Sequence, residues 1–182
     1  RPGIADEVLH FMVRLVQLQR GIELLQRRFE VPRDKALPAG IDESGKGDFF
    51  GPLVIAGVYV DREIARKFLE AGIQDSKRIG SDKRIRDLAK MIRTTPGAIG
   101  DAVSIGPERY NDLYEKFGNL NSLLGWGHAR VIENLLHRKP DCPRAVSDKF
   151  ADASVIEKAL LKHGQKIRLE QRTKAESDLA VA

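Results

Sequence analysis

The sequence predicts one α/β domain built on a mixed β-sheet, preceded by a helical segment. A glycine-rich turn, SGKGDFFGP, joins two strand-like segments and indicates a β-hairpin. After this hairpin, segments with helical periodicity alternate with β-branched segments, an order typical of α/β domains. The length of 182 residues suits one domain with an appendage.

The appendage, residues 1–36, is predicted to be an amphipathic helix followed by a linker. Its apolar residues recur at alternating spacings of four and three, which is the period of a coiled-coil seam. They are Ile4, Val8, Phe11, Leu15, Leu18, Ile22, Leu25 and Phe29. Pro32 and Pro38 mark the linker. The helix over 4–29 either packs on its own chain or self-associates with a second copy, and the pattern leaves both interpretations open.

The domain itself is expected over residues 37–182. Its strand-like segments are 39–42, 53–60, 98–105, 144–148 and 165–171. Its helical segments are 64–72, 81–92, 107–117, 121–138, 153–163 and a last helix that begins at Thr173. Ser81 is the expected N-cap of the second helix, and Pro107 occupies the first turn of the third.

Composition excludes several classes of protein. No apolar run approaches the roughly 20 residues of a membrane span, and the first residues do not resemble a signal peptide. The single Cys142 provides no disulfide framework, which fits a reducing compartment. We therefore expect a cytoplasmic protein that does not associate with membranes.

The charge pattern favours an acidic partner, with nucleic acid first. The formal net charge is +5, and residues 61–93 hold ten basic and six acidic side chains. Residues 162–174 hold five basic and one acidic side chain. The turn region 40–60 has the opposite balance, three acidic residues against Lys46. An acidic spot in basic surroundings is typical of a metal-dependent enzyme that acts on a polyanion.

The hairpin turn nearly matches a phosphate-binding loop. The string GIDESGKG fits the pattern GxxxxGK, but Gly47 stands where a Ser or Thr hydroxyl should bind magnesium. Asp42 and Glu43 would also repel the phosphates inside such a loop. We therefore predict no nucleotide cofactor.

Four carboxylates are candidates for a site. Asp42 and Glu43 follow a short strand and precede flexible glycines, so both are expected to reach one centre that suits Mg²⁺ or Mn²⁺. The alternative is a solvated acidic turn. Asp148 ends a later strand, and the alternative to a site residue is an N-cap or loop acid. Glu176 is otherwise the N3 residue of a capping box with Thr173.

Other reactive side chains offer no clear motif. The four histidines (His10, His128, His137 and His163) show no paired-ligand spacing. Cys142 and Ser44 lack the context of a nucleophile. We interpret all of them as structural or solvated.

Five segments together resemble ribonuclease HIII, of the type 2 ribonuclease H family. They are GIDESGKGDFFGPLVIAGVYV, QDSKRI, YNDLYEKFGNLNSLLGWGHA, VSDKF and TKAESDLAVA, in the family's order across residues 40–182. Lys46 in DESGKG is the HIII form of the motif. The resemblance implies a ribonuclease H-like fold, with a central mixed sheet flanked by helices, and hydrolysis of the RNA strand of RNA–DNA hybrids that leaves a 5′-phosphate.

The resemblance also implies the site. The family's catalytic and metal-binding carboxylates match Asp42, Glu43, Asp148 and Glu176, which would hold two Mg²⁺ or Mn²⁺ ions. Its nucleic-acid contacts match Gly45, Lys46, Gly47, Ser76 and Lys77. The alternative for Lys77 is a plain surface lysine.

Two departures from the family pattern concern the chain ends. The family usually carries an N-terminal domain similar to the TATA-binding protein, and only about 39 residues precede the motif here. The helix over 4–29 is then a remnant or a replacement of that substrate-binding domain, or a dimer contact. The family's continuation after LAVA is also missing, so we expect the catalytic domain to be truncated at its C-terminus.

Two other functions fit the same fold. One is a non-catalytic module that binds hybrids or DNA, and the other is a ribonuclease H-like nuclease that acts on DNA. Retention of four carboxylates disfavours the module, because binding a polyanion gains nothing from clustered acids. The GKG turn, with its expected ribose contact, disfavours the DNA nuclease.

Overall fold

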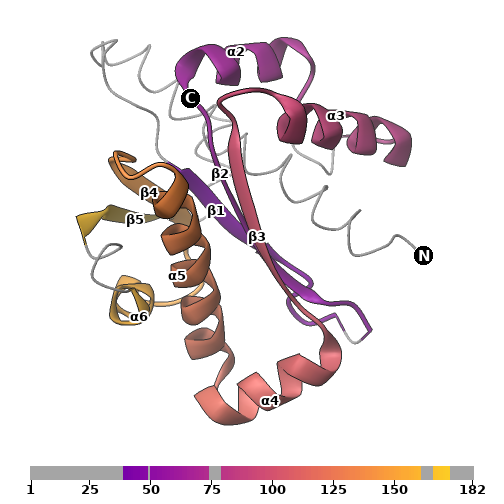
Figure 1. Ribbon diagram of the computed structural model, residues 1–182. Coiled ribbons are helices and arrows are strands. Elements are labelled where there is room, and N and C mark those ends of the chain that lie inside the picture. Colours follow the sequence, from indigo (N-terminus) through magenta and orange to yellow (C-terminus); the bar gives the residue numbers. More distant parts are fainter. Residues whose placement is uncertain (1–38, 49, 74–78, 161–165, 173–182) are drawn as a thin grey trace.

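A computed structural model describes residues 39–48, 50–73, 79–160 and 166–172 (Figure 1). The predicted helices over 4–29 and from Thr173 lie outside these residues, as does the proposed boundary between the appendage and the domain. No helix of the described part has the length and apolar character needed to cross a membrane.

Five strands form one mixed sheet in the order β3-β2-β1-β4-β5. The strands are β1 (Ala39–Ser44), β2 (Leu53–Tyr59), β3 (Ile99–Ile105), β4 (Arg144–Asp148) and β5 (Arg168–Arg172). β1, β2 and β3 pair antiparallel, whereas β4 lies parallel to β1 and β5 lies parallel to β4. The sheet is mixed, as the sequence predicts, and β1 and β2 form the predicted hairpin.

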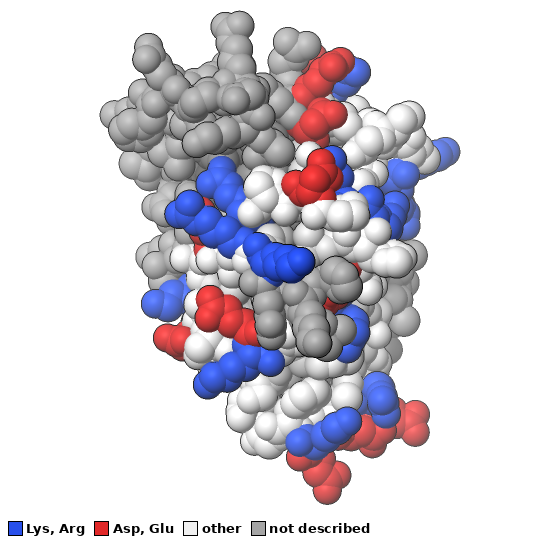
Figure 2. Space-filling model, turned by 60° about the vertical axis from the view of Figure 1, so that its left-hand side comes forward, with Lys and Arg blue, Asp and Glu red and all other residues white. Residues whose placement is uncertain are grey.

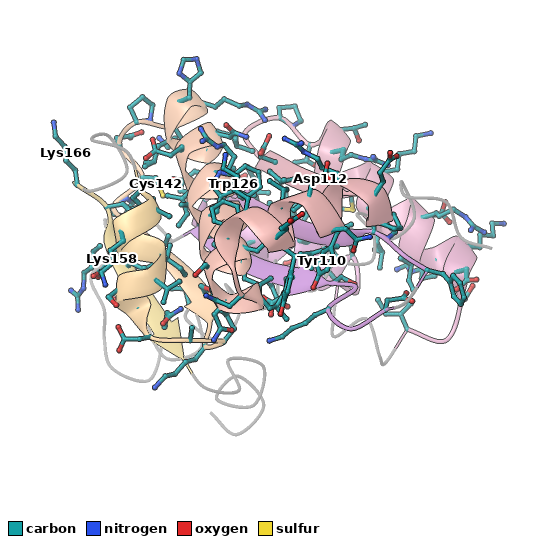
Figure 3. All side chains as sticks on the ribbon, turned by 90° about the horizontal axis from the view of Figure 1, so that it is seen from below. Tyr110, Asp112, Trp126, Cys142, Lys158 and Lys166 are labelled. Carbon is teal, nitrogen blue, oxygen red and sulfur yellow. The ribbon has the colours of Figure 1, made fainter. Side chains whose placement is uncertain are left out.

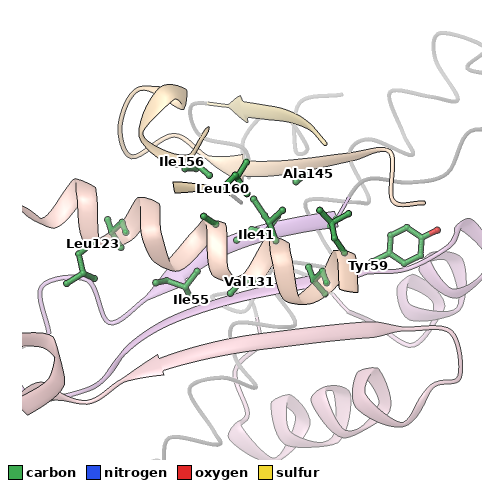
Figure 4. Close-up of a cluster of buried hydrophobic side chains, with 14 of the residues drawn as sticks. Ile41, Ile55, Tyr59, Leu123, Val131, Ala145, Ile156 and Leu160 are labelled. Atoms are coloured by element: carbon green, nitrogen blue, oxygen red, sulfur yellow. The ribbon is translucent and has the colours of Figure 1, made fainter. Parts of the chain in front are cut away.

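Helices lie on both faces of the sheet (Figure 1). They are α2 (Arg62–Glu70), α3 (Asp82–Thr94), α4 (Pro107–Phe117), α5 (Leu120–Arg138) and α6 (Ala153–Ala159). The apolar residues of α2 and α3 pack on one face with Ala56, Val58 and Val146. α5 covers the other face, packing against Ile41 and Ile55 (Figure 4).

The helix ends follow local chemistry. Ser81 caps α3, where its side chain accepts a hydrogen bond from the amide of Arg84, and Pro107 begins α4, both as predicted. Asn119 caps α5 by accepting from the amide of Ser122 at 2.8 Å. α4 contacts α5 through the rings of Phe117 and Trp126, whose centroids lie 5.9 Å apart (Trp126 is labelled in Figure 3).

Several predicted boundaries are wrong. The helix expected over 64–72 is α2 over Arg62–Glu70, and α3 continues to Thr94 and not only to 92. β1 continues two residues past Asp42, because Glu43 and Ser44 pair with Ile55 and Val54 of β2. α6 ends at Ala159 and not at 163, because Leu160 takes an extended conformation and is buried in the core beside α5. β5 begins at Arg168 and not at 165, where its parallel pairing with Arg144 begins.

Candidate active site

The predicted site lies at the carboxyl end of β1, the middle strand of the sheet. Asp42 lies opposite Ala56 of β2, and Glu43 lies opposite Ile55. Residues directly opposite one another share a face of the sheet. Ala56 belongs to the core under α2 and α3, whereas Ile55 belongs to the core under α5. Asp42 and Glu43 therefore lie on opposite faces of the sheet.

This arrangement differs from the sequence-based expectation. That expectation ended the strand at Asp42, so that glycines could bend both acids toward one centre. Because the strand continues to Ser44, regular alternation applies to both acids. Asp42 is buried, with 4% of its surface exposed, and its Oδ1 accepts a hydrogen bond from the amide of Glu43 at 2.9 Å.

The register of the parallel pair brings Asp42 and Asp148 to neighbouring positions. Ile41 of β1 pairs with Ser147 of β4, and each strand continues by one residue to an aspartate. The carboxyl ends of these parallel strands lie at the same edge of the sheet, where open α/β sheets place their sites. Two acids about 106 positions apart in the chain thus occupy adjacent positions in the sheet.

Glu43 meets a buried polar pair on the α5 face. Its Oε2 lies 3.1 Å from Nε2 of His128 on α5. The other ring nitrogen, Nδ1, lies 3.1 Å from Oγ of Ser147 on β4. His128 and Ser147 are both completely buried. Three elements, β1, α5 and β4, therefore meet in one hydrogen-bonded chain of side chains.

Lys46 lies beside Glu43 from the hairpin turn. Its Nζ is 3.8 Å from Oε1 of Glu43, and 42% of the lysine side chain is exposed. Gly45 and Gly47 on either side of it have φ values of +80° and +83°. A side chain at Gly45 would also collide with the carbonyl oxygen of Pro52, so only glycine fits there. The turn thus presents Lys46 at the edge that carries the acids.

The side chains of several other predicted site residues are not described. The structure describes the backbone of Asp148 but not its side chain, and Ser76, Lys77 and Glu176 lie outside the described residues. Within the described ranges no group of three or more His, Cys, Asp or Glu side chains is arranged to hold a metal. The chemistry of Asp42 and Glu43 nevertheless fits a hard divalent cation, because carboxylate oxygens are its preferred ligands.

Sequence reasoning missed His128 and Ser147 as part of this site. A signal for His128 exists: it lies four residues after Leu124 and three before Val131, on the apolar stripe of α5. A histidine on a stripe that faces the sheet must find a polar partner there. Ser147 has no comparable signal, since a serine in a short strand is common.

Charge on the surface is mixed near the sheet edge. Glu170 of β5 lies 3.4 Å from both Arg144 and Arg168. Figure 2 likewise shows Lys and Arg side chains interspersed with Asp and Glu over one face. On the face that Figure 2 shows, basic and acidic side chains are therefore mixed.

Comparison with known proteins identifies relatives. The ribonuclease HII family model matches residues 39–182. The chain is 48% identical over 143 residues to ribonuclease HIII of Protochlamydia amoebophila, covering 79% of this chain and 46% of that protein. It is 46% identical over 154 residues to ribonuclease HIII of Chlamydia pneumoniae, covering 84% and 51%. The chain thus spans about half the length of the curated relatives it matches.

Solved structures of ribonuclease HIII have a similar fold. The crystal structure of Bst-RNase HIII in complex with Mn²⁺ matches with a TM-score of 0.64 at 27% identity, over 77% of this chain and 46% of that chain. Aquifex aeolicus RNase H3 matches with a TM-score of 0.59 at 31% identity, over 88% and 57%. The predicted fold class, a mixed sheet flanked by helices, is confirmed by these matches.

Proposed function

Because the chain belongs to the ribonuclease HII family and matches its HIII members, we propose that it hydrolyses the RNA strand of RNA–DNA hybrids. The observation that carries the proposal is the register of β1 and β4, which puts Asp42 and Asp148 side by side at one sheet edge. A binding module has no use for two acids at such close positions, since they repel a polyanion. A hydrolase that uses divalent cations needs them.

Asp42, Glu43, Asp148 and Glu176 are the residues that would hold Mg²⁺ or Mn²⁺ in this proposal. When bound, two such ions supply an activated water and stabilise the leaving 3′ oxygen. The chain's own contribution is the placement of the acids. Asp42 sits on a strand that is paired on both sides, so its backbone is fixed before any ion binds.

Substrate recognition is proposed for the hairpin turn and for the segment around Lys77. Lys46 is half exposed between two glycines and can approach a phosphate of the nucleic acid. The glycines leave main-chain groups accessible to a ribose 2′-OH, which distinguishes RNA from DNA. Ser76 and Lys77 would contact a neighbouring phosphate.

The test is cleavage of a hybrid labelled on its RNA strand. We expect cleavage with Mg²⁺ or Mn²⁺, products with 5′-phosphate and 3′-hydroxyl ends, and no cleavage after chelation with EDTA. Duplex DNA and duplex RNA of the same sequence are the controls. Cleavage of duplex DNA would favour the DNA nuclease, and metal-independent binding without cleavage would favour the binding module.

We propose a cytoplasmic location, supported by the single cysteine, and an appendage over residues 1–36 that is separate from the domain over 37–182.

Self-association through the helix over 4–29 is a further part of the proposal. Leu18→Glu places a charge in the expected seam. If light scattering gives the same mass for the parent and for this variant, copies do not associate through this helix.

A further inference from the structure

We propose that His128 is a positioning residue that holds the Glu43 carboxylate in one orientation for metal binding. This inference rests on the proposed function, because it takes Glu43 as a metal ligand. It adds a residue on α5, which is distant in sequence from all four predicted carboxylates. His128 acts through Glu43 and does not itself touch the substrate.

For an ionised Glu43 carboxylate and a neutral His128 ring, chemistry fixes the hydrogen-bond directions. An ionised carboxylate only accepts hydrogen bonds, so the 3.1 Å contact with Oε2 of Glu43 requires a proton on Nε2 of His128. In the neutral ring Nδ1 then accepts, and the Ser147 hydroxyl donates to it across 3.1 Å. Ser147 therefore selects the tautomer that directs an N–H at Glu43. Rotation of the ring would break both contacts.

The two carboxylate oxygens of Glu43 are held by different groups. Oε2 faces His128 and Oε1 faces Lys46, and only 11% of the Glu43 side chain is exposed. Two contacts on different oxygens define the plane of the carboxylate, which one contact does not. A carboxylate held in this way keeps one orientation before an ion binds.

Packing makes His128 a rigid support. The ring is completely buried and lies 4.7 Å from the ring of Phe150, centroid to centroid. The preceding residue, Gly127, brings α5 so close to β2 that a side chain there would collide with Cδ1 of Ile55. The short distance between helix and sheet puts the imidazole within reach of β1.

A purely structural role explains this arrangement less well. The apolar stripe of α5 would be filled at lower cost by leucine, because a buried imidazole must have both nitrogens satisfied. Here both nitrogens are used, and one of them holds an acid at the sheet edge where Asp42 and Asp148 lie. Residues that hydrogen-bond to a metal ligand orient it in the same manner, and their loss typically weakens metal affinity by about tenfold to a hundredfold.

The experiment compares three variants with the parent chain by Mn²⁺ titration and thermal melting. His128→Phe keeps the ring volume and removes both hydrogen bonds. His128→Asn keeps a polar group near Ser147 but is too short to reach Glu43, whereas His128→Gln is one methylene longer. We expect the dissociation constant for Mn²⁺ to rise about tenfold or more in the Phe and Asn variants and to recover largely in the Gln variant. His137→Phe, at an exposed histidine of the same helix, is the matched control.

The outcomes separate the inference from the proposed function. A parent chain that neither binds Mn²⁺ nor cleaves hybrids would reject both. A parent that does both, with folded Phe or Asn variants binding Mn²⁺ within twofold of it, would overturn the role of His128 alone. Nitrogen NMR of the histidine ring in the parent gives a check that needs no variant. A ring protonated only at Nδ1 would also overturn the inference.

Discussion

The contact between Gly127 and Ile55 leads to a quantitative prediction about the packing of α5. Alanine at 127 would place a methyl group against Cδ1 of Ile55, with Cγ1 of the same side chain 3.3 Å away. Ile55 is completely buried, so its end has little room to move. Overpacking of this kind costs about 1–3 kcal/mol. The higher helix propensity of alanine stabilises the fold by about 1 kcal/mol relative to glycine inside a helix.

The net expectation for Gly127→Ala is therefore a loss of about 0–2 kcal/mol in the free energy of unfolding. Ile55→Val alone removes Cδ1 and should cost about 0.5–1.5 kcal/mol. In the double variant the alanine methyl occupies the space that Cδ1 left. We expect its stability to lie close to that of the parent, which corresponds to a coupling of about 0.5–3.5 kcal/mol, the sum of the two single losses.

Urea unfolding of the four proteins measures this coupling, provided that the m-value stays constant. Coupling below about 0.5 kcal/mol, the limit for independent sites, would refute the close approach of α5 to β2. Mn²⁺ affinity measured on the same proteins adds a second test. Gly127→Ala should weaken it, because His128 follows directly on the displaced helix, and Ile55→Val should restore it.

Three further predictions concern single residues. Asp42→Asn should abolish cleavage of the hybrid and leave the melting temperature unchanged or raised, because it relieves repulsion near Asp148; full activity at matched metal concentration would remove Asp42 from the site. Lys46→Ala should lower the slope of log affinity against log salt by about 0.7–0.9, the value of one phosphate contact; an unchanged slope in a binding titration would exclude that contact. Burial raises the pKa of the Cys142 thiol, so the thiol should react slowly with disulfide reagents until the chain unfolds. Because folding raises this pKa, the unfolded chain loses the thiol proton at a lower pH than the folded chain does. The free energy of unfolding is therefore unaffected by this thiol at neutral pH and falls as the pH rises above the ordinary thiol pKa of about 8.5. Cys142→Ala should remove this fall.

Much of the fold is readable from the sequence because pattern and packing agree. β2 has the sequence LVIAGVY, with no charged residue and three β-branched residues, and it is buried on both faces. The α5 stripe through Leu124, Val131 and Leu135 is buried against the sheet as its spacing predicts. Ser81 caps its helix because its hydroxyl competes well for the free amides of the first turn.

The errors arise where a neighbouring strand or helix decides the conformation. Glu43 and Ser44 have low strand propensity, but β2 lies beside them and supplies partners for their backbone groups. The sequence also indicates which acids are candidates without indicating on which face each one lies. That depends on whether the strand stops at Asp42 or at Ser44, a difference of two residues. His128 enters the site through the same kind of long-range contact, 85 positions from Glu43.

This alternation sets a specific requirement for the proposed site. A regular strand can bring Asp42 and Asp148 together, because they occupy neighbouring positions on parallel strands, but it directs Glu43 to the opposite face. For Glu43 to serve the same pair of ions, its side chain must be aimed toward the carboxyl edge of the sheet by something other than the strand. His128 contacts one of its oxygens, and Lys46 lies near the other. Metal affinity should therefore respond to substitutions of His128 in the α5 core as well as to substitutions of the acids themselves.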